Sequence, residues 1–529
     1  MTRRARWPQV RKIGGRGTRQ WPTDWTVNKV GIGHKVGSLS KTEAAATVLR
    51  SPVMASPVQR HATVLAHHLY DFAECEHRVA LDAALDREQR TPPDEAMRLL
   101  LEHGQRFERE VVEPLGYPAV DVVDGDWQRA FARTLELMRE GVAGIDQGVL
   151  LDGARLARPD LLERVSGRSA LGDFHYVPGD VKSAVTARSD AALQVGFAAL
   201  LLETLQGVRP DAGFLILGDG RREELNLESI RCTVDDAVER TEQVALGQAE
   251  TSPFFSPACA RCRWRGACLP RLEEGRDLSF VHGMTRARRR VLSRQGIATI
   301  DDLAGADVAA LAAAGVPAEG LERMRTQART LLDGRVLRRA APGLPRGAKR
   351  EAYLRIELDP LDGGQPFSIA WGDAAAGAPI AAARVAVVSS GDERAAALRE
   401  LVDTLDAPAL RKEPIYTFGS GTAAAFDALA EECALEPARA GDVAGRFVDL
   451  APWVRRAAVL PVFLYRFDEV AAVARDLPRP SPGQAEDALF VLHAGLPASQ
   501  EPGAVRDRLI ASGRDALASL RAIRAWFAA

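Results

Sequence analysis

The amino-acid sequence predicts an α/β protein of several domains. Its 529 residues suffice for two to four domains, each with a core of its own. Segments with strand alternation stand between segments with helical spacing, and residues 336–349, which carry Pro, Gly, Lys and Arg, form a linker between two such regions. The shares of hydrophobic residues, 46%, and charged residues, 26%, are those of a soluble globular chain.

Composition also indicates where the protein is located in the cell and which partners it can bind. No apolar run reaches the roughly 18 residues that a membrane span needs, and no secretory signal is visible, so we expect a cytoplasmic protein without membrane contact. The net charge of −2 gives no global signature of nucleic-acid binding. Any contact with DNA would therefore come from local patches or bound metal.

Residues 1–53 differ from the rest of the chain. They carry eleven Lys and Arg residues against only Asp24 and Glu43, and they show no periodicity. We interpret them as a disordered basic extension, with Met54 as an alternative start, because they cannot bury a core. The other interpretation is a basic arm that touches DNA.

A short stretch, Tyr176 to Ala184, places a carboxylate beside an amine. Asp180 and Lys182 are two residues apart, so in a strand both side chains emerge on the same face. An acid can hold a hard divalent cation, and a lysine can orient water or neutralise a reacting phosphate. Alone, this pair also fits a surface strand with an ion pair, so its neighbours decide the interpretation.

Those neighbours are two helices and a hairpin. Residues 94–115 predict a helix on which Gly104 and Glu108 share a face, and residues 189–206 predict another that carries Gln194. Asp152-Gly153 predicts a hairpin turn.

The second strand of that hairpin is expected to carry Asp160, directly after Pro159.

The sequence resembles RecB-like nucleases of the PD-(D/E)xK superfamily, because it has their motifs in the same order along the chain. These motifs are Gly104-x-x-x-Glu108, Pro159-Asp160, Asp180-x-Lys182 and Gln194. The resemblance implies a restriction-endonuclease-like core. It implies Mg²⁺ or Mn²⁺ ligation by Glu108, Asp160 and Asp180. It also implies catalysis by Lys182, with Gln194 in a supporting role.

The resemblance covers about residues 61–275, and we expect the nuclease domain over residues 54–275. One departure is plain. The family usually has Tyr four residues after the Gln that corresponds to Gln194, and here that position is Ala198. This departure concerns the DNA-contacting role of the helix more than the metal site.

Four cysteines make a second pattern. Cys75 stands near the start of this region, and Cys259-x2-Cys262-x5-Cys268 stands at its end, whereas Cys232 and Cys433 are isolated. Clustered thiols in a cytoplasmic chain point to a metal site, and the spacing alone fits either zinc or an iron–sulfur cluster.

The pattern resembles the four-cysteine iron–sulfur staple of AddB-type and CRISPR-associated RecB-like nucleases. That resemblance implies a 4Fe–4S cluster that ties together the two ends of the domain, with zinc as the alternative. Arg261, Arg263, Trp264 and Arg265 lie between the ligands. We expect them to shield the cluster and offset its charge, in preference to touching DNA.

Beyond the motifs, residues 216–231 predict two strands and residues 234–248 a helix. Residues 280–335 predict a helical segment similar to helix–hairpin–helix modules, with turns at Gly296 and Gly315 whose N–H groups can hold a phosphate. Local positive charge comes from Arg286, Arg288, Arg289 and Arg290. The alternative is a solvated helical linker.

Residues 350–529 resemble an RNase H-like domain with a damaged site. The family's first strand carries Asp-x-Glu, and here it carries Arg355-x-Glu357. A guanidinium cannot ligate a cation, so Asp449 and Asp515 are expected to be a helix-start acid and a surface acid. We expect an inactive scaffold or nucleic-acid-binding platform.

Together these resemblances imply a metal-dependent DNA nuclease of RecB-like type that acts in DNA repair or recombination. Its substrate would be single-stranded DNA or DNA ends, and a helicase or repair protein would be a partner. The alternative is a non-catalytic nucleic-acid-binding protein that keeps the nuclease fold and an iron–sulfur or zinc site.

Overall fold

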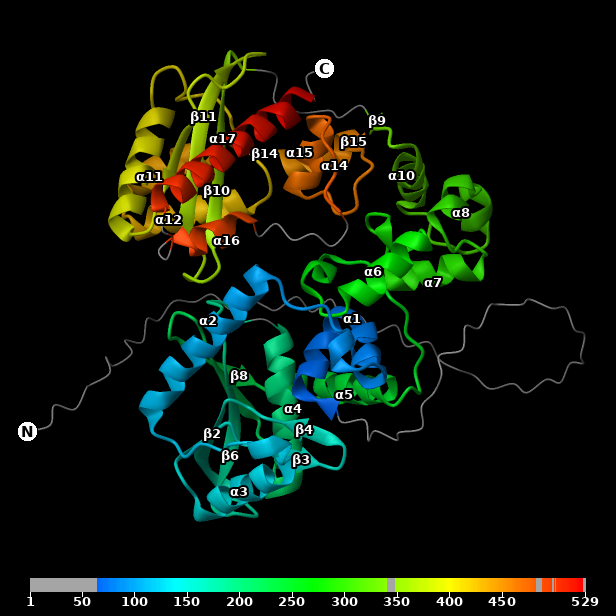
Figure 1. The fold of residues 1–529 in the computed structure, drawn as a ribbon, viewed down its shortest axis with the longest axis vertical. Coiled ribbons are helices and arrows are strands. Elements are labelled where there is room, and N and C mark those ends of the chain that lie inside the picture. Colours follow the sequence, from blue (N-terminus) through cyan, green and yellow to red (C-terminus); the bar gives the residue numbers. More distant parts are fainter. Residues whose placement is uncertain are drawn as a thin grey trace, which may run out of the picture. The chain divides into compact units, whose positions relative to one another are not determined.

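The computed structural model describes residues 64–187, 189–339, 348–481, 488–496, 499 and 501–526. Helices and strands alternate through both large regions, which confirms the α/β prediction (Figure 1). The predicted basic extension, residues 1–53, lies outside the described residues. Within them, no helix is both long enough and apolar enough to cross a bilayer.

The first region is built on a five-stranded sheet. Its strands, in spatial order, are β2 (Gly144–Asp146), β5 (Leu161–Ser169), β6 (Gly172–Val181), β7 (Ala212–Ile216) and β8 (Arg222–Asn226). Only β6 and β7 run parallel, and α4 (Ser189–Gln206) makes the crossover between them, over the residues that the sequence predicts.

A smaller sheet corrects the expected place of Asp160. It holds β1 (Val64–Leu65), β4 (Arg155–Ala157) and β3 (Leu150–Asp152), and the hairpin turn lies at Gly153-Ala154, one residue later than predicted. The second strand of the hairpin ends at Ala157, so it does not carry Asp160. The chain changes sheets across Pro159, which has no N–H to donate to a ladder, and Asp160 stands directly before β5.

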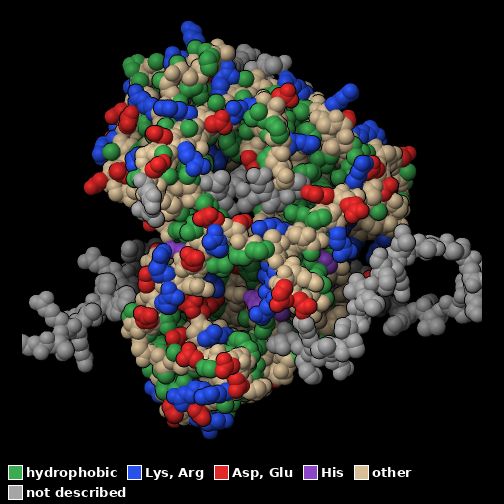
Figure 2. Space-filling view, in the orientation of Figure 1, with side chains coloured by type: hydrophobic (Ala, Val, Ile, Leu, Met, Phe, Trp, Pro, Cys, Tyr) green, Lys and Arg blue, Asp and Glu red, His purple; other side chains and the backbone are tan. Residues whose placement is uncertain are grey.

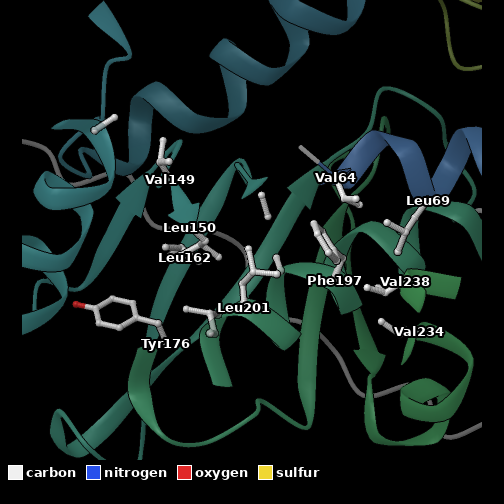
Figure 3. Packing of buried hydrophobic residues seen from close by; sticks show 14 of the residues in the cluster. Val64, Leu69, Val149, Leu150, Leu162, Tyr176, Phe197, Leu201, Val234 and Val238 are labelled. Carbon is white, nitrogen blue, oxygen red and sulfur yellow. The ribbon is translucent and has the colours of Figure 1, made fainter. Parts of the chain in front are cut away.

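Five helices surround these sheets and close the core: α1 (Ala66–Ala84), α2 (Glu95–Val112), α3 (Trp127–Glu140), α4 and α5 (Arg231–Ala245). Figure 3 shows Leu162 and Tyr176 of the sheet with Phe197 and Leu201 of α4 in one buried cluster. The predicted helix at 94–115 is confirmed: Asp94 caps α2 by accepting from the Met97 N–H, and a 3₁₀ turn follows the helix.

The strands predicted at 216–231 are only partly right. β7 begins earlier, at Ala212, and β8 ends at Asn226, with a turn at Asp219-Gly220 between them. The left-handed φ of Gly220, 76°, lets the chain reverse there. The helix predicted at 234–248 begins at Arg231 and ends at Ala245.

A helical segment follows, with α6 (Arg265–Glu274), α7 (Arg286–Arg294), α8 (Ile300–Gly305), α9 (Val308–Ala313) and α10 (Leu321–Asp333). Its turns fall at Gly296 and Gly315, as predicted, and both glycines have positive φ. Phe463 packs on Phe255 and Phe280 of this segment's core. The segment is therefore not independent of residues 350–529.

The expected linker, residues 336–349, contains a strand. β9 (Leu337–Arg338) pairs antiparallel with β15 (Ala458–Val459), and residues 340–347 lie outside the described residues. The linker prediction is thus wrong at its start.

The last region has a second five-stranded sheet, in the order β12 (Arg384–Val387), β11 (Gln365–Ala375), β10 (Arg350–Asp359), β13 (Ile415–Thr417) and β14 (Phe447–Asp449). The first three strands pair antiparallel, and β13 and β14 are parallel to β10.

Helices cover both faces of this sheet. Leu354 packs with α11 (Gly391–Leu405) and α12 (Gly421–Glu432), whereas the next residue back, Tyr353, packs with α17 (Pro502–Trp526). Because neighbouring strand residues point to opposite faces, α17 lies on the other side from α11 and α12. The remaining helices are α13 (Pro437–Ala444), α14 (Leu450–Ala457), α15 (Phe467–Ala474) and α16 (Ala488–Ala494).

Charge is mixed on the visible face of the molecule. Figure 2 shows Lys and Arg side chains interspersed with Asp and Glu over all of its described parts. This distribution agrees with the net charge of −2 and places any nucleic-acid contact in a local patch.

One buried side chain replaces a missing strand partner. β7 pairs with β6 only from Gly179 onward. Before that point, the fully buried Gln206 accepts from the Tyr176 N–H (2.9 Å) and donates to the Tyr176 carbonyl (3.0 Å), as a neighbouring peptide group would.

Replacing Gln206 by Leu, which keeps the volume, should destabilise the protein by about 3 kcal/mol, because the peptide groups of Tyr176 are then buried without partners. Urea unfolding of the Gln206→Leu variant measures this. The exposed Gln243→Leu on α5 is the control. Equal stability of Gln206→Leu and wild type would mean that this amide is not needed.

Candidate functional site

Four of the predicted site residues meet at one end of the first large sheet. In the β5–β6 ladder Leu161 pairs with Gly179, so Asp160 and Asp180 stand next to each other at its end. The Val181 N–H donates to Asp160 Oδ2 (2.7 Å), and Lys182 forms an ion pair with Asp180. Glu108 comes from α2.

A fifth residue, Gln147, joins them and was not predicted. Its Nε2 donates to Glu108 and to Asp160 Oδ1 (3.0 Å), and its backbone N–H donates to the Asp160 carbonyl (3.0 Å). Gln147 follows β2, whose last residue, Asp146, pairs with Leu161. Only this strand pairing, which no local motif indicates, would have located it.

Negative charge is concentrated in this site. Burial, Asp180 and Glu108 raise the pKa of Asp160 well above its ordinary value. Burial, Asp180 and Asp146 likewise raise the pKa of Glu108.

Lys182 is the cation that faces these acids. Burial opposes its charge, but the carboxylates of Asp180 and Asp160 outweigh that effect and raise the pKa of Lys182. One ammonium group thus faces three carboxylates, and the site has a deficit of positive charge.

The donor set fits a hard divalent cation. Carboxylate oxygens are the ligands that Mg²⁺ and Mn²⁺ prefer, and a cation would counter the burial and the repulsion that raise the pKa values of Glu108 and Asp160. Gln147 now donates to one oxygen of each of these acids. Its amide would have to give up these hydrogen bonds for both acids to bind a cation through the same oxygens.

The remaining predicted site residue is Gln194. It is half-buried on α4, and among the described residues no hydrogen bond or ion pair joins it to Glu108, Asp160, Asp180 or Lys182. Ala198, one turn later, is only 2% exposed and belongs to the core. This face of α4 is used for packing and does not offer position 198 to a ligand.

The four patterned cysteines line one enclosed cavity: Cys75, Cys259, Cys262 and Cys268. Cys75 interrupts α1 with an extended backbone (φ −161°, ψ 101°). The Ser256 N–H points at Cys259 Sγ and the Trp264 N–H at Cys262 Sγ, each at 3.4 Å. Such N–H···S contacts are typical of thiolates that bind a metal or cluster.

The thiols also affect one another's charge. Burial, Cys262 and Cys75 raise the pKa of Cys268 to about 12, so it would need a bound cation to ionise at neutral pH. By contrast, Cys232 is exposed on α5, and Cys433 lies outside this cavity.

The size of the cavity does not decide between an iron–sulfur cluster and zinc. Its free space is about 20 Å³, which is small for a four-iron cluster, so the thiols would have to move apart to admit one. Yet among the described residues no three of these thiols lie within 4.8 Å of one another. Thiolates around one zinc ion stand about 3.8 Å apart, so zinc would require them to move together.

One cation beside the thiols is Arg78, which was not predicted. Burial opposes its charge, but Cys262, Glu74 and Asp71 raise the pKa of Arg78 above its usual value. Its Nη2 donates to the Ala258 carbonyl (3.1 Å), which ties α1 to the cysteine-bearing segment.

Two of the residues between the cysteines bind acids of α1. Arg263 forms ion pairs with the buried carboxylates of Asp71 and Asp82. Trp264 is fully buried and donates from Nε1 to Asp82 (2.9 Å). These contacts tie the end of the domain to α1 without any cofactor. Trp264 nonetheless lines the cysteine cavity, as expected of a shielding residue.

One further group of metal-ligand types lies nearby. His67, His68 and Asp82 have ligand atoms within 4.8 Å of one another, the one such group of three among the described residues. However, Asp82 already accepts from Arg263 and from Arg90 (2.6 Å). These guanidinium groups oppose a second cation, so the group fits a buried acid–arginine network better than a metal site.

The residues that the resemblance compares with an RNase H site have other contacts in the last region. Arg355 Nε donates to Glu357 (2.6 Å) and its guanidinium stacks over Phe467. Asp449 starts α14 by accepting from the Ala451 N–H, and Asp515 pairs with Arg475 at the surface. The three acids thus have structural partners of their own.

The helical segment also has less free positive charge than expected. Arg286 lies over Phe254, Arg288 contacts Met324, and Arg289 pairs with Asp277, whereas Arg290 is exposed.

The turns of this segment have no spare N–H groups at their glycines. The N–H groups of Gly296 and Gly315 bond carbonyls of the preceding helices, as do those of the residues that follow them. They cannot also hold a phosphate.

A scan against protein-family models finds no match to this chain, and a search of curated proteins finds none either. Support for any activity therefore comes from the residues and their geometry.

Removing one charge from the carboxylate cluster should stabilise the fold. At pH 7 without divalent metal, Glu108→Gln should be more stable than wild type by about 1 kcal/mol, as is common when a functional site is relieved of strain. The exposed Glu110→Gln on the same helix is the control.

The pH dependence has a defined sign. A raised pKa means that the folded state binds the proton more tightly than the unfolded chain. Wild type should therefore gain stability as the pH falls from neutral toward the ordinary carboxyl range, and Glu108→Gln should gain less. The measurement is the free energy of unfolding of both proteins at several pH values. The same dependence on pH in wild type and Glu108→Gln would contradict the proposed repulsion among these acids.

Proposed function

We propose that the chain is a metal-dependent DNA nuclease of the RecB-like type, with a restriction-endonuclease-like core. The observation that carries the proposal is the meeting of Glu108, Asp160, Asp180 and Lys182 at one end of a mixed sheet. They come from three separate segments. A merely structural ion pair would not need three carboxylates around one lysine.

Each residue has a distinct role in this proposal. Glu108, Asp160 and Asp180 would hold Mg²⁺ or Mn²⁺, which activates water and stabilises the charge that develops on a phosphodiester. Lys182, held beside Asp180, would neutralise the reacting phosphate. Gln147 is a positioning residue, because it fixes Glu108 relative to Asp160.

For the last region, residues 350–529, we propose an inactive RNase H-like domain. Its strand order, with three antiparallel strands followed by two parallel ones, is compatible with that fold. Arg355 at the ligand position and the separate partners of Asp449 and Asp515 argue against a second cation site.

For the cysteines we propose a 4Fe–4S cluster, with zinc as the alternative. The support is a common cavity, N–H donors aimed at two thiols, and Arg78 beside Cys262. When bound, the cluster would add covalent links between α1 and the end of the domain. A role in DNA repair or recombination and a helicase partner rest on resemblance alone.

A second function is favoured by one observation. Gln147 already donates to Glu108 and Asp160, and Asp180 already pairs with Lys182, so each acid has a partner without a metal. This arrangement suits a non-catalytic nucleic-acid-binding protein. The two functions differ in one respect, which is cleavage that depends on added metal.

Cleavage of single-stranded and duplex DNA with Mn²⁺ tests the proposal. Asp180→Asn and Lys182→Met should each lower the rate at least about 100-fold, because each removes charge from the reacting centre. Lys412→Met, at an exposed lysine of the last region, is the control and should cleave as wild type does. Wild-type protein that cleaves no DNA with any divalent metal would leave only the binding function.

Metal and sulfide analysis after anaerobic purification tests the cofactor. Brown protein with about four irons and four sulfides is expected, and Cys75→Ala should bleach it and make residues 64–275 more sensitive to protease. Cys232→Ala should keep the colour, because that thiol lies outside the cavity. Colourless protein with one zinc would contradict the cluster and support the alternative.

A further inference from the structure

A broad groove rich in arginine lies beside the cysteine cavity. It encloses about 1110 Å³, and Cys262 lines both hollows. Six arginines of the nuclease region line it: Arg78, Arg87, Arg90, Arg261, Arg263 and Arg265. The acids in its lining are Asp71 and Glu74, and both already form ion pairs with Arg78.

The groove therefore keeps an excess of positive charge. Arg78, Arg90 and Arg263 form ion pairs with buried acids, which holds them in place. Arg87 and Arg261 are exposed at the same groove. This local patch contrasts with the net charge of −2 for the whole chain.

Apolar and aromatic side chains share the lining with these cations. Tyr70, Met97 and Leu101 all face the groove, and Leu101 is 52% exposed. A single-stranded nucleic acid presents both phosphates and unpaired bases, and proteins bind it by combining positive charge with aromatic or apolar contacts. A duplex hides its bases and would leave these side chains unused.

The groove and the carboxylate cluster share one face of α2. Met97, Leu101, Gly104 and Glu108 are spaced by four, three and four residues, so they form a single stripe. Glu108 lies about 16 Å along the helix axis from Met97. A strand held in the groove would thus point along α2 toward the acids.

Between them, Gly104 leaves the helix surface bare. A Cβ at this position would meet no atom within 4 Å, so packing does not require the glycine, although glycine in a helix interior costs about 1 kcal/mol relative to alanine. The bare surface leaves room for another chain to pass close to the helix backbone.

We propose that this groove holds the sugar–phosphate backbone of single-stranded DNA and leads it across Gly104 to the acids. The inference rests on the proposed nuclease function for its direction, but the binding itself needs no metal. Arg87 and Arg261 contact phosphates, and Tyr70, Met97 and Leu101 contact bases.

Fluorescence anisotropy with a labelled oligothymidylate, in metal-free buffer, tests the binding. Arg87→Ala combined with Arg261→Ala should weaken binding at least tenfold. It should also lower the slope of log affinity against log salt by about 1.4, since each lost phosphate contact removes about 0.7. The control combines Arg129→Ala and Arg139→Ala, which remove two exposed arginines of α3 and should change neither quantity.

The outcomes separate this inference from the nuclease proposal. Asp180→Asn should bind the oligonucleotide as wild type does, whether or not the protein cleaves. Unchanged affinity and slope in the Arg87/Arg261 variant would overturn the groove and leave the nuclease proposal standing. Tighter binding of a hairpin duplex than of the oligothymidylate would overturn the single-strand assignment.

Gly104→Leu tests the path. It should fold at least as stably as wild type, because leucine favours a helix and meets no neighbour here. It should keep Mn²⁺ affinity but lower cleavage of single strands at least tenfold. Wild-type cleavage by a stably folded Gly104→Leu protein would show that no strand passes over this position.

Discussion

Mutual repulsion of three carboxylates is the constraint on which the candidate site depends. The β5–β6 register brings Asp160 next to Asp180, and α2 adds Glu108, so the fold holds like charges together that would separate in an unfolded chain. Lys182 and the Gln147 amide offset this repulsion only in part. The rest of the sheet must therefore be stable enough to impose the arrangement, and its buried core supplies that stability.

A second constraint closes the domain on itself. Asp71 and Asp82 of α1 bind Arg263, which lies more than 180 residues later in the chain for Asp82 and more than 190 for Asp71. Breaking one partner of such a buried pair is costly because the other charge remains buried. The same contacts bring Cys75 to the cavity that the three later cysteines also line. The arginine-rich groove lies on this closure, and three of its arginines, Arg78, Arg90 and Arg263, pair with the same acids.

The sequence could locate those site residues that belong to local patterns. Helical spacing predicts the helix that carries Glu108, and strand alternation puts Asp180 and Lys182 on one face, whereas their site roles come from the family resemblance. The bounds of α4 agree with the predicted helix at 189–206. Asp160 was identified but placed in the wrong strand, because the chain's change of sheet at Pro159 depends on pairings distant in the sequence. Gln147 and Arg78 were missed for the same reason, since each acts through a partner on another element. Ala198, where the family usually has Tyr, is packed in the core, which agrees with the departure noted in the sequence. The supporting role of Gln194 stays a prediction.

Calorimetric titration with Mn²⁺ in two buffers of different ionisation enthalpy tests the central claim most directly. If Glu108, Asp160 and Asp180 hold the cation, its binding must displace protons from the acids with raised pKa values. We expect one site in wild type, with proton release that grows as the pH is lowered from neutral, and no such site in Asp180→Ala. Wild-type protein that binds no Mn²⁺, or binds it equally well after Asp180→Ala, would contradict the account.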